Sequence, residues 1–200
     1  VVFSGPNSET TETNSPYSHI RIVTDVSNDK YLPFAIQYPT TVHANINEQI
    51  VAIVDYEKQQ YIKEMQSLHA KYDKNIVGEL NISFEMYEFE ENYYSFLLQT
   101  KRSIPGKKPT HSYNTVVMDN DGNVISVDKL LNYNEESLKT LSSQIQAFIL
   151  NEDKFSHINE MVIKGQTSAE WGNFEEFIIH EDHINFYFNN LVEKQLNEPL

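Results

Sequence analysis

NINEQIVAIVDYEKQQYIKEMQSLHAKY, residues 45–72, and LNISFEMYE, residues 80–88, are the two stretches that decide the fold. In the first, apolar residues recur at three- and four-residue spacings, which is the period of an amphipathic α-helix. In the second, apolar and polar side chains alternate, which is the period of a strand with one buried face. Asn45 is the expected helix N-cap, with Glu48 three residues on, and Gly78 marks the exit from the helix. The chain therefore combines one long helix with strands.

Strand patterns flank these stretches on both sides. Ile20, Ile22, Thr24 and Val26 occupy alternate positions and are expected on one face of their strand. The Asp121-Gly122 pair is a strong hairpin signal, and Glu181-Asp182 is the expected turn of a last hairpin. The segments expected to form strands are residues 17–26, 31–38, 80–87, 93–103, 113–118, 124–127, 174–179 and 184–188.

A second helix is expected after Asn134, its predicted N-cap. Its apolar positions step by three and four residues and are expected to face the core: Leu138, Leu141, Ile145, Phe148 and Ile149. The order is strands, helix, meander, helix and hairpin. It predicts the α+β class, with antiparallel strands in hairpins and a meander packed by one long and one shorter helix.

Composition narrows the classes of function. Apolar residues make up 40% of the chain, with 12 Tyr and 11 Phe, enough for a sizeable core, and the absence of cysteine excludes disulfides and thiolate chemistry. Lys plus Arg is 15 against 29 Asp plus Glu, a net charge of −14, which disfavours nucleic acid and anionic lipid as partners. We expect no direct membrane insertion, since no segment approaches the ~20 apolar residues of a membrane span.

Three regions are predicted along the chain. Residues 1–16 are expected to be a flexible linker behind a signal or membrane anchor, because the apolar Val1-Val2-Phe3 precedes a Ser/Thr/Asn/Glu/Pro tract. A processed or tagged terminus is the alternative. Residues 17–125 and 126–200 are expected to be two α+β halves that share one core. The chain stops at Leu200 without a closing turn or cap, so we expect it to continue.

His180-Glu181-Asp182-His183 is the cluster with the most chemistry, since metal sites use imidazole and carboxylate. The two histidines straddle a predicted turn rather than lying at i and i+4 of a helix, and no third ligand is recognisable nearby. We therefore expect an ordinary polar hairpin turn and no metal, and we expect no cofactor elsewhere.

Other candidate motifs have simpler interpretations. Residues 119–123 (DNDGN) do not match a calcium loop, because Gly122 would be fourth and Leu130 twelfth, so a tight turn is expected. The glutamates of residues 79–91 are expected on a solvated face rather than as a paired-carboxylate glycosidase site. Trp171 is expected to fill the core or plug a loop, with sugar stacking as the alternative. The sequence contains no nucleophile elbow and no phosphate-binding glycine loop.

Five stretches carry a resemblance to a known family: Tyr38-Pro39 before the long helix, residues 80–88, residues 110–119 (THSYNTVVMD) running into Gly122, residues 127–131 (VDKLL) and residues 177–188 (FIIHEDHINFYF). In this order they resemble the PdaC/RsiV-like extracytoplasmic module, and the likeness spans residue 17 to the end. Two departures stand out. Lys108-Pro109-Thr110 replaces the family's Gly-Gly-Ala before His111, and His183 replaces a turn glycine, so His183 is expected to adopt a left-handed conformation.

The resemblance implies two functions of different classes. One is a non-catalytic, membrane-anchored extracellular accessory domain of a Gram-positive cell-wall polysaccharide (peptidoglycan) deacetylase, whose enzymatic domain would lie beyond Leu200. The deacetylase signature, Thr-Phe-Asp-Asp-Gly with a later His-x-x-x-His, is absent from these residues. The alternative is the ligand-sensing ectodomain of an anti-sigma factor, with lysozyme binding favoured by the acidic charge. A surface spacer without a ligand is a third possibility.

Either function implies an extracytoplasmic location at the cell surface. The expected partner is a cell-wall glycan or a cationic protein such as lysozyme. The residues expected to face a ligand are His111, Trp171, His180 and His183.

Overall fold

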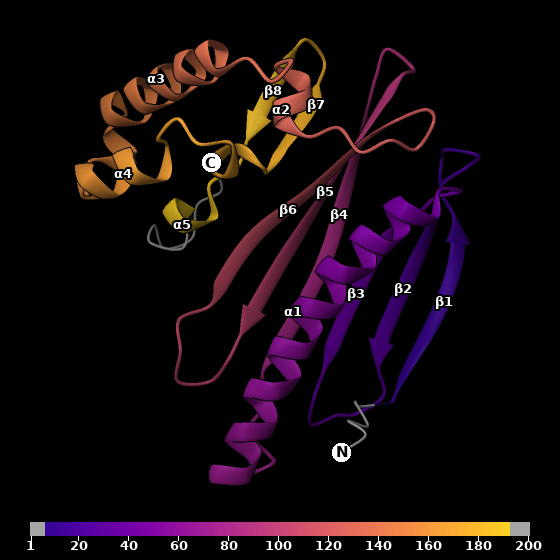
Figure 1. The fold of residues 1–200 in the computed structure, drawn as a ribbon. Coiled ribbons are helices and arrows are strands. Elements are labelled where there is room, and N and C mark those ends of the chain that lie inside the picture. The colour runs from indigo at the N-terminus through magenta and orange to yellow at the C-terminus, as the bar shows by residue number, and fades with distance from the viewer. Residues whose placement is uncertain (1–6, 193–200) are drawn as a thin grey trace. The chain divides into compact units, whose positions relative to one another are not determined.

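The computed structural model describes residues 7–192 (Figure 1). The strands are β1 (Ser8–Asn14), β2 (Arg21–Ser27), β3 (Phe34–Thr40), β4 (Glu79–Phe89), β5 (Tyr93–Ser103), β6 (Thr110–Asp119), β7 (Phe177–His180) and β8 (His183–Phe186). The helices are α1 (Ala44–Lys71), α2 (Val127–Leu130), α3 (Glu135–Asn151), α4 (Glu160–Gln166) and α5 (Asn189–Val192), with the 3₁₀ turns η1 (Asp153–Phe155) and η2 (Trp171–Phe174). The predicted α+β class is confirmed.

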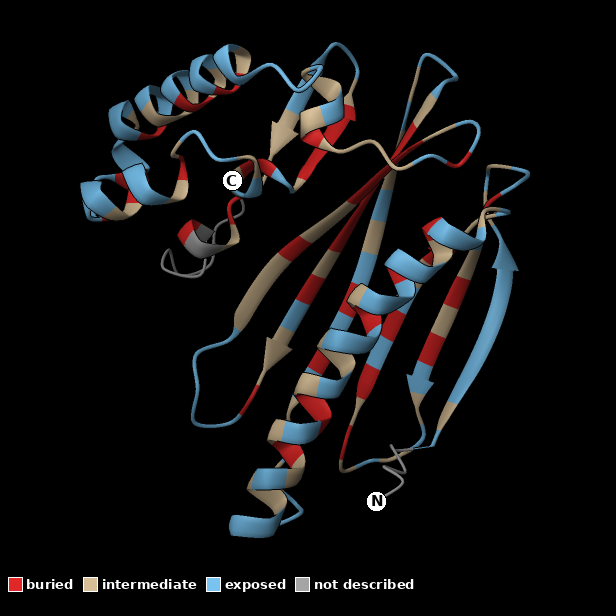
Figure 2. Ribbon diagram, viewed as in Figure 1, coloured by how far each residue is buried: buried red, intermediate tan, exposed pale blue. Residues whose placement is uncertain are grey.

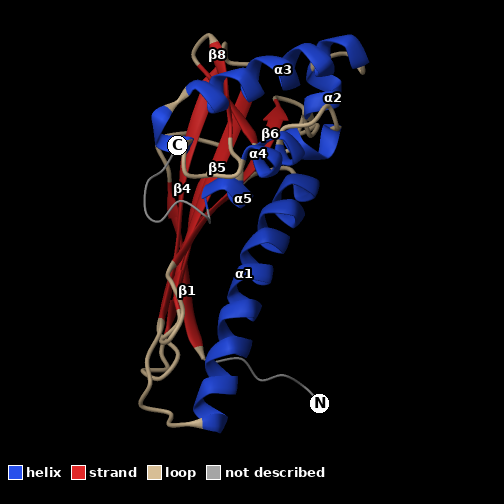
Figure 3. Ribbon diagram, turned by 90° about the vertical axis from the view of Figure 1, so that its left-hand side faces the viewer, coloured by secondary structure: helices blue, strands red, loops and turns tan. Residues whose placement is uncertain are grey.

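The strands form two sheets (Figure 3). Six of them lie in the order β1-β2-β3-β4-β5-β6, and β7 pairs with β8 in a separate two-stranded sheet. The pairs β1–β2 and β2–β3 are antiparallel, whereas β3 and β4, which α1 connects, are parallel. The chain divides into two compact units. Unit 1 comprises residues 1–86 and 96–114, and unit 2 comprises residues 87–95 and 115–200.

The long helix α1 matches the prediction within a residue at each end. Its buried positions follow the helical period and face the strands of unit 1 (Figure 2): Ile46, Ile50, Val54, Tyr61, Ile62 and Met65. The predicted Asn45 cap is wrong, since His43 is the N-cap and makes no side-chain capping bond. Asn47 instead turns back, and its Oδ1 accepts from the backbone N–H of Thr41 at 2.7 Å. That bond fixes the entry of the chain into the helix.

The expected N-terminal linker contains a strand. Ser8–Asn14 form β1, which pairs with β2 from Ser8↔Ser27 to Asn14↔Arg21. Its threonines favour extended backbone, and the free edge of β2 supplies hydrogen-bond partners that local composition does not reveal. Residues 1–6 and 193–200, on which the expected anchor and the expected continuation rest, lie outside the described residues.

The buried face of β2 is opposite to the one predicted. Val23 and Asp25 are buried, whereas Val26 is 42% exposed. Because side chains alternate along a strand, choosing the wrong face inverts the burial of every residue. Ile20, which precedes β2, is buried as expected, whereas the positions of Ile22 and Val26 indicated the wrong face of the strand itself.

The alternation of β4 was predicted correctly, since Leu80 and Ile82 are buried and Asn81 and Ser83 between and after them are exposed. The predicted strand at 124–127 is wrong. Only a single bridge joins Met118 to Val124, and Val127 opens α2. Val127 is buried in the core of unit 2, so that burial outweighs the β-propensity of this short run.

Unit 2 has its own apolar core around Phe155, Phe174 and Phe177, all of them nearly fully buried. Asn134 caps α3 as predicted, and its Oδ1 accepts from the N–H groups of Glu136 and Ser137. The expectation that Phe148 is buried is wrong: it is 60% exposed. Each helical residue turns by ~100°, so Phe148 lies on the flank of the stripe that buries Ile149 and Leu138.

The last hairpin forms across Glu181-Asp182 as predicted, with His180 directly opposite His183. The left-handed residue in its turn is Glu181, with φ of 55°, and not His183 as expected. Among residues 7–192, no helix is both long and apolar enough to cross a membrane.

Candidate functional site

A groove of about 480 Å³ lies in unit 2 between α3, η1 and the segment that begins with β8. We call it the aromatic groove. It is lined by Ile145, Phe148, Ile149, Lys154, Phe155, Ile184, Asn185, Phe186, Tyr187 and Phe188. Its volume lies within the range of small-molecule sites in proteins, which are mostly apolar with a few polar groups.

The two walls of the groove follow from the elements that build them. On α3, Phe148 lies beside the row of apolar residues that packs into the core, and its ring is exposed to solvent. On the other wall, β8 pairs only with β7 in the described sheet and exposes Ile184 by 37%. Phe155 forms the floor and is 1% exposed. Exposed aromatic and aliphatic surface at the rim therefore meets a buried apolar base.

Two residues that line the aromatic groove, Lys154 and Asn185, have polar side chains with different chemistry. Lys154 supplies an ammonium group, which lies 5.2 Å from the centroid of the Phe155 ring and makes no ion pair with the described residues. Asn185, on β8, supplies an amide that can both donate and accept hydrogen bonds. Stacking rings, an amide and one cation suit a ligand with apolar faces, hydroxyl or amide groups and a carboxylate.

The hairpin that carries one wall is fixed by side-chain hydrogen bonds to the strands of unit 2. Ser95 Oγ accepts from the N–H of Ile179 at 2.9 Å, and Thr115 Oγ1 accepts from the N–H of Phe177 at 2.9 Å. The carboxylate of Glu176 accepts from both the N–H and the hydroxyl of Thr115. The hydrogen bonds from Phe177 and Ile179 pair backbone N–H groups on the edge of β7 that does not face β8. They hold the β7–β8 hairpin, and with it β8, in place along the aromatic groove.

His180 and His183 are brought together by the hairpin. Their ring centroids are 5.5 Å apart, and the ring of Tyr87 packs on His180 at 4.5 Å. Oε1 of Glu181 is 4.0 Å from Nε2 of His180. Oδ1 of Asp182 is 3.3 Å from Nδ1 of His183. The predicted turn is therefore a compact cluster of imidazoles and carboxylates at the end of β8.

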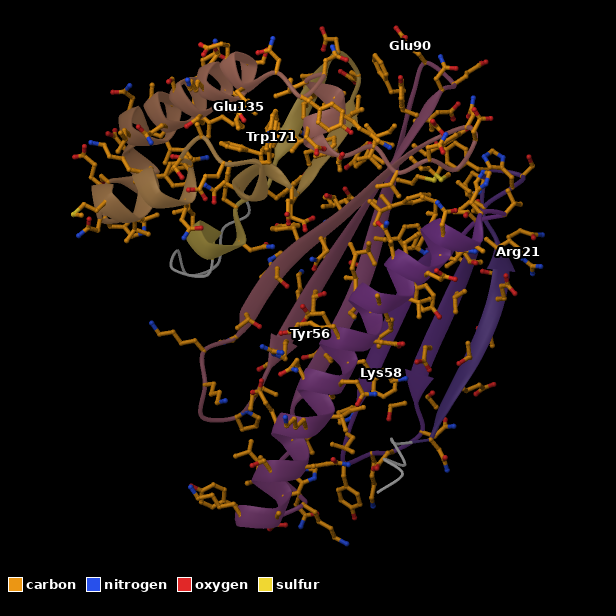
Figure 4. The ribbon with its side chains drawn as sticks, in the orientation of Figure 1. Arg21, Tyr56, Lys58, Glu90, Glu135 and Trp171 are labelled. Carbon is orange, nitrogen blue, oxygen red and sulfur yellow. The ribbon has the colours of Figure 1, made fainter. Side chains whose placement is uncertain are left out.

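The other two expected ligand-facing residues lie elsewhere. His111 belongs to unit 1, where its ring packs on Tyr113 at 4.7 Å and its buried Nε2 has no hydrogen-bond partner among the described residues. Burial, together with the ammonium of Lys101, lowers the pKa of His111 below its ordinary value. Trp171 packs against the core of unit 2, in agreement with the core interpretation (Figure 4).

The interpretations of the acidic motifs agree with the structure. The carboxylate of Asp119 accepts from the N–H groups of Asp121 and Asn123 at 2.9 Å, so it closes a tight turn. The glutamates of the meander, Glu79, Glu85, Glu88, Glu90 and Glu91, are all exposed. Neither motif contributes to the aromatic groove.

Sequence reasoning missed the aromatic groove itself. The helical spacing of Phe148 predicts that it lies in the core, and no sequence pattern singles out Lys154 or Asn185. The signal that could have indicated the groove is in residues 184–188 (INFYF), where three aromatic residues occur within five positions in and just after the last strand.

No family model matches the chain. A curated relative is the peptidoglycan-N-acetylmuramic acid deacetylase PdaC of Bacillus subtilis (strain 168), which is 22% identical over 178 residues. These residues are 88% of this chain but 38% of that protein, so the chain spans well under half of the relative's length. A solved structure, that of a DUF3298 family member from Bacteroides fragilis, is 11% identical with a TM-score of 0.46, over 91% of this chain and 81% of that one. The chain is thus similar to one part of a cell-wall polysaccharide deacetylase.

Proposed function

We propose that this chain is a non-catalytic, extracytoplasmic accessory module of a cell-envelope polysaccharide deacetylase. The observation that carries the proposal is the alignment of 88% of the chain with 38% of PdaC. The chain is similar to a region far shorter than the deacetylase as a whole. In this function the module keeps the enzyme at the cell wall and presents its glycan substrate, while the hydrolysis occurs in another domain.

The aromatic groove is the proposed contact with the glycan. Pyranose rings have apolar faces that stack on aromatic side chains, and the exposed ring of Phe148 offers such a surface. N-acetylmuramic acid, which the relative's name specifies, has an acetamido group and a carboxylate. The amide of Asn185 can bond the acetamido group, and the ammonium of Lys154 can pair with the carboxylate. The rest of the chain is acidic, so Lys154 is well suited to select an anionic sugar locally.

Calorimetry with soluble peptidoglycan fragments tests the glycan contact. Phe148→Ala is expected to weaken binding by roughly 5–30-fold, which corresponds to a loss of 1–2 kcal/mol. Tyr56→Ala is the matched control, since Tyr56 is 63% exposed on α1 and lies outside the aromatic groove (Figure 4). Equal effects of the two substitutions, or no binding by the unmodified chain, would contradict the proposal.

Lys154→Ala tests how the sugar is recognised. We expect it to weaken binding of fragments that contain N-acetylmuramic acid and to leave binding of chitooligosaccharides, which lack the carboxylate, nearly unchanged. An equal loss for both ligands would mean that Lys154 acts through packing on Phe155 rather than through charge.

The absence of catalysis is tested separately. The chain is expected to release no acetate from chitooligosaccharides or peptidoglycan, with or without added divalent metal ions. Turnover that disappears in His180→Ala or His183→Ala would show that the chain is itself an enzyme.

A second candidate function is the sensing of a cationic protein such as lysozyme. The net charge of −14 favours such a partner. Calorimetry with lysozyme at about 0.15 M salt, where the Debye length is ~8 Å, distinguishes the two functions. Micromolar or tighter binding there would favour the sensor of an anti-sigma factor, and weak binding that salt abolishes would leave the accessory module.

A further inference from the structure

We propose that the β7–β8 turn binds a divalent transition-metal ion of the Zn²⁺ class. The site consists of the imidazoles of His180 and His183 and the carboxylates of Glu181 and Asp182. We call it the turn site. It is separate from the aromatic groove and needs neither the glycan nor any catalytic activity.

The backbone places the two imidazoles for chelation. His180 and His183 are directly opposite each other in the antiparallel register, so their side chains emerge on the same face of the hairpin. Their ring centroids are 5.5 Å apart. Two imidazoles held this close by a short hydrogen-bonded hairpin lose little conformational freedom when they share an ion.

The sequence indicated no third ligand beside the two histidines, whereas the folded turn brings the carboxylates of Glu181 and Asp182 to the site as further ligands. The ligating atoms of Glu181, Asp182 and His183 all lie within 4.8 Å of one another. In a tetrahedral zinc site with bonds of ~2.0–2.1 Å, ligand atoms are separated by roughly 3.3–3.5 Å. The Asp182–His183 distance of 3.3 Å already meets this geometry, and the Glu181–His180 distance of 4.0 Å nearly does. His180 is not one of the three residues within 4.8 Å; Glu181, Asp182 and His183 are exposed and can close the remaining distances to its imidazole by rotation about their own bonds.

The donor set selects the kind of ion. Two nitrogen and two oxygen donors suit Zn²⁺, Ni²⁺ or Cu²⁺, whereas Ca²⁺ and Mg²⁺ need more oxygen donors. Behind the site, Tyr87 packs on the ring of His180 at 4.5 Å and restricts its orientation. In known sites, hydrogen-bonding partners outside the ligand set contribute roughly 10–100-fold to metal affinity, so a ligand itself is expected to contribute at least as much.

Calorimetric titration of the tag-free chain with Zn²⁺ tests the proposal. We expect one ion per chain, and a loss of affinity of about 10-fold or more in His180→Ala and in His183→Ala, because losing a ligand costs at least as much as losing its support. His157→Ala is the matched control, since His157 is an exposed histidine of unit 2 outside the turn site. Circular dichroism of each variant checks that the fold is kept.

A second measurement locates the ion directly. Paramagnetic Cu²⁺ should broaden the NMR signals of His180 and His183 at substoichiometric amounts and spare those of His157. No saturable binding, an equal loss in His157→Ala, or binding that survives the loss of both turn histidines would overturn the proposal. Glycan binding is measured separately at Phe148, so the turn site and the proposed function can fail independently.

Discussion

Nζ of Lys58 on α1 lies 2.7 Å from Oδ2 of Asp25 on β2, and both side chains are largely buried, 19% and 11% exposed. The same ammonium lies 4.7 Å from the centroid of the Phe34 ring, and the hydroxyl of Thr10 donates to Asp25 at 3.5 Å. In Figure 4, Lys58 lies on the part of α1 beside the strands of unit 1. The Lys58–Asp25 ion pair therefore joins α1 to β2 in a largely buried position.

Lys58→Met should destabilise the chain by about 3 kcal/mol, because it leaves the Asp25 carboxylate buried without its counter-ion. Urea denaturation followed by circular dichroism measures the change. Lys139→Met, which removes an exposed pair with Glu136 at 3.2 Å, should cost no more than ~0.5 kcal/mol. Equal costs at the two sites would mean that the Lys58–Asp25 pair is effectively solvated.

Gly78→Ala should destabilise unit 1 by about 1–3 kcal/mol, the usual cost of overpacking. A Cβ at Gly78 would lie 2.7 Å from Sδ of Met65 and 2.7 Å from the carbonyl oxygen of Ser103, and the carbonyl cannot rotate away. Gly165→Ala is the control, since a Cβ there meets nothing within 4 Å, and alanine in α4 should stabilise by ~0.5–1 kcal/mol. Thermal unfolding measures both effects: the midpoint should fall for Gly78→Ala and rise for Gly165→Ala.

Ile50→Ala should lower the free energy of unfolding by about 2–5 kcal/mol, because Ile50 lies on the buried face of α1 and is fully buried. Phe148→Ala should change stability by less than about 0.5 kcal/mol, as is usual for an exposed position. Urea denaturation compares the two. A large loss at Phe148 would show that its ring is covered in solution and would also undermine its use as a probe of glycan binding.

Tyr61 should titrate well above an ordinary tyrosine. Burial, followed by the carboxylates of Glu79 and Asp29, raises the pKa of Tyr61 to about 12, and its hydroxyl donates to the carbonyl of Pro33 at 2.6 Å. In the unfolded chain this phenol ionises near pH ~10. The folded chain therefore holds the proton longer, and the contribution of Tyr61 to stability is complete below about pH 10 and lost as the pH rises toward 12.

Tyr61→Phe tests this alkaline effect. The variant should be less stable at neutral pH by about 1 kcal/mol, the net value of one hydrogen bond, and should lose less stability between pH 10 and 12 than the unmodified chain. Burial also raises the pKa of Tyr38 and Tyr113, so part of the alkaline loss should remain. An unchanged pH profile would contradict the assignment to Tyr61.

Elements with strong local signals could be predicted from the sequence. The period of residues 45–72, the alternation of β4 and the cap at Asn134 each depend on residues within a few positions of one another. The hairpin of His180 and His183 was predicted for the same reason. Its geometry was not, because the distance between two imidazoles depends on the register and rotamers that the folded hairpin adopts.

Partners distant in sequence could not be predicted. The strand character of Ser8–Asn14 depends on the edge of β2, and the buried face of β2 depends on which side α1 covers. Asp25 is buried because Lys58 lies 33 positions away in the chain and beside it in space.

The sequence by itself determined the α+β class, the long helix, the acidic charge and the turn that joins the two histidines, because periodicity, composition and turn chemistry are local properties. Only the tertiary structure decided that Phe148 faces solvent and that it forms a groove with Lys154 and Asn185. The physical reason is that a helix presents more apolar positions than one core can cover. Which of them remains exposed depends on the element that packs against it, and no local pattern specifies that element.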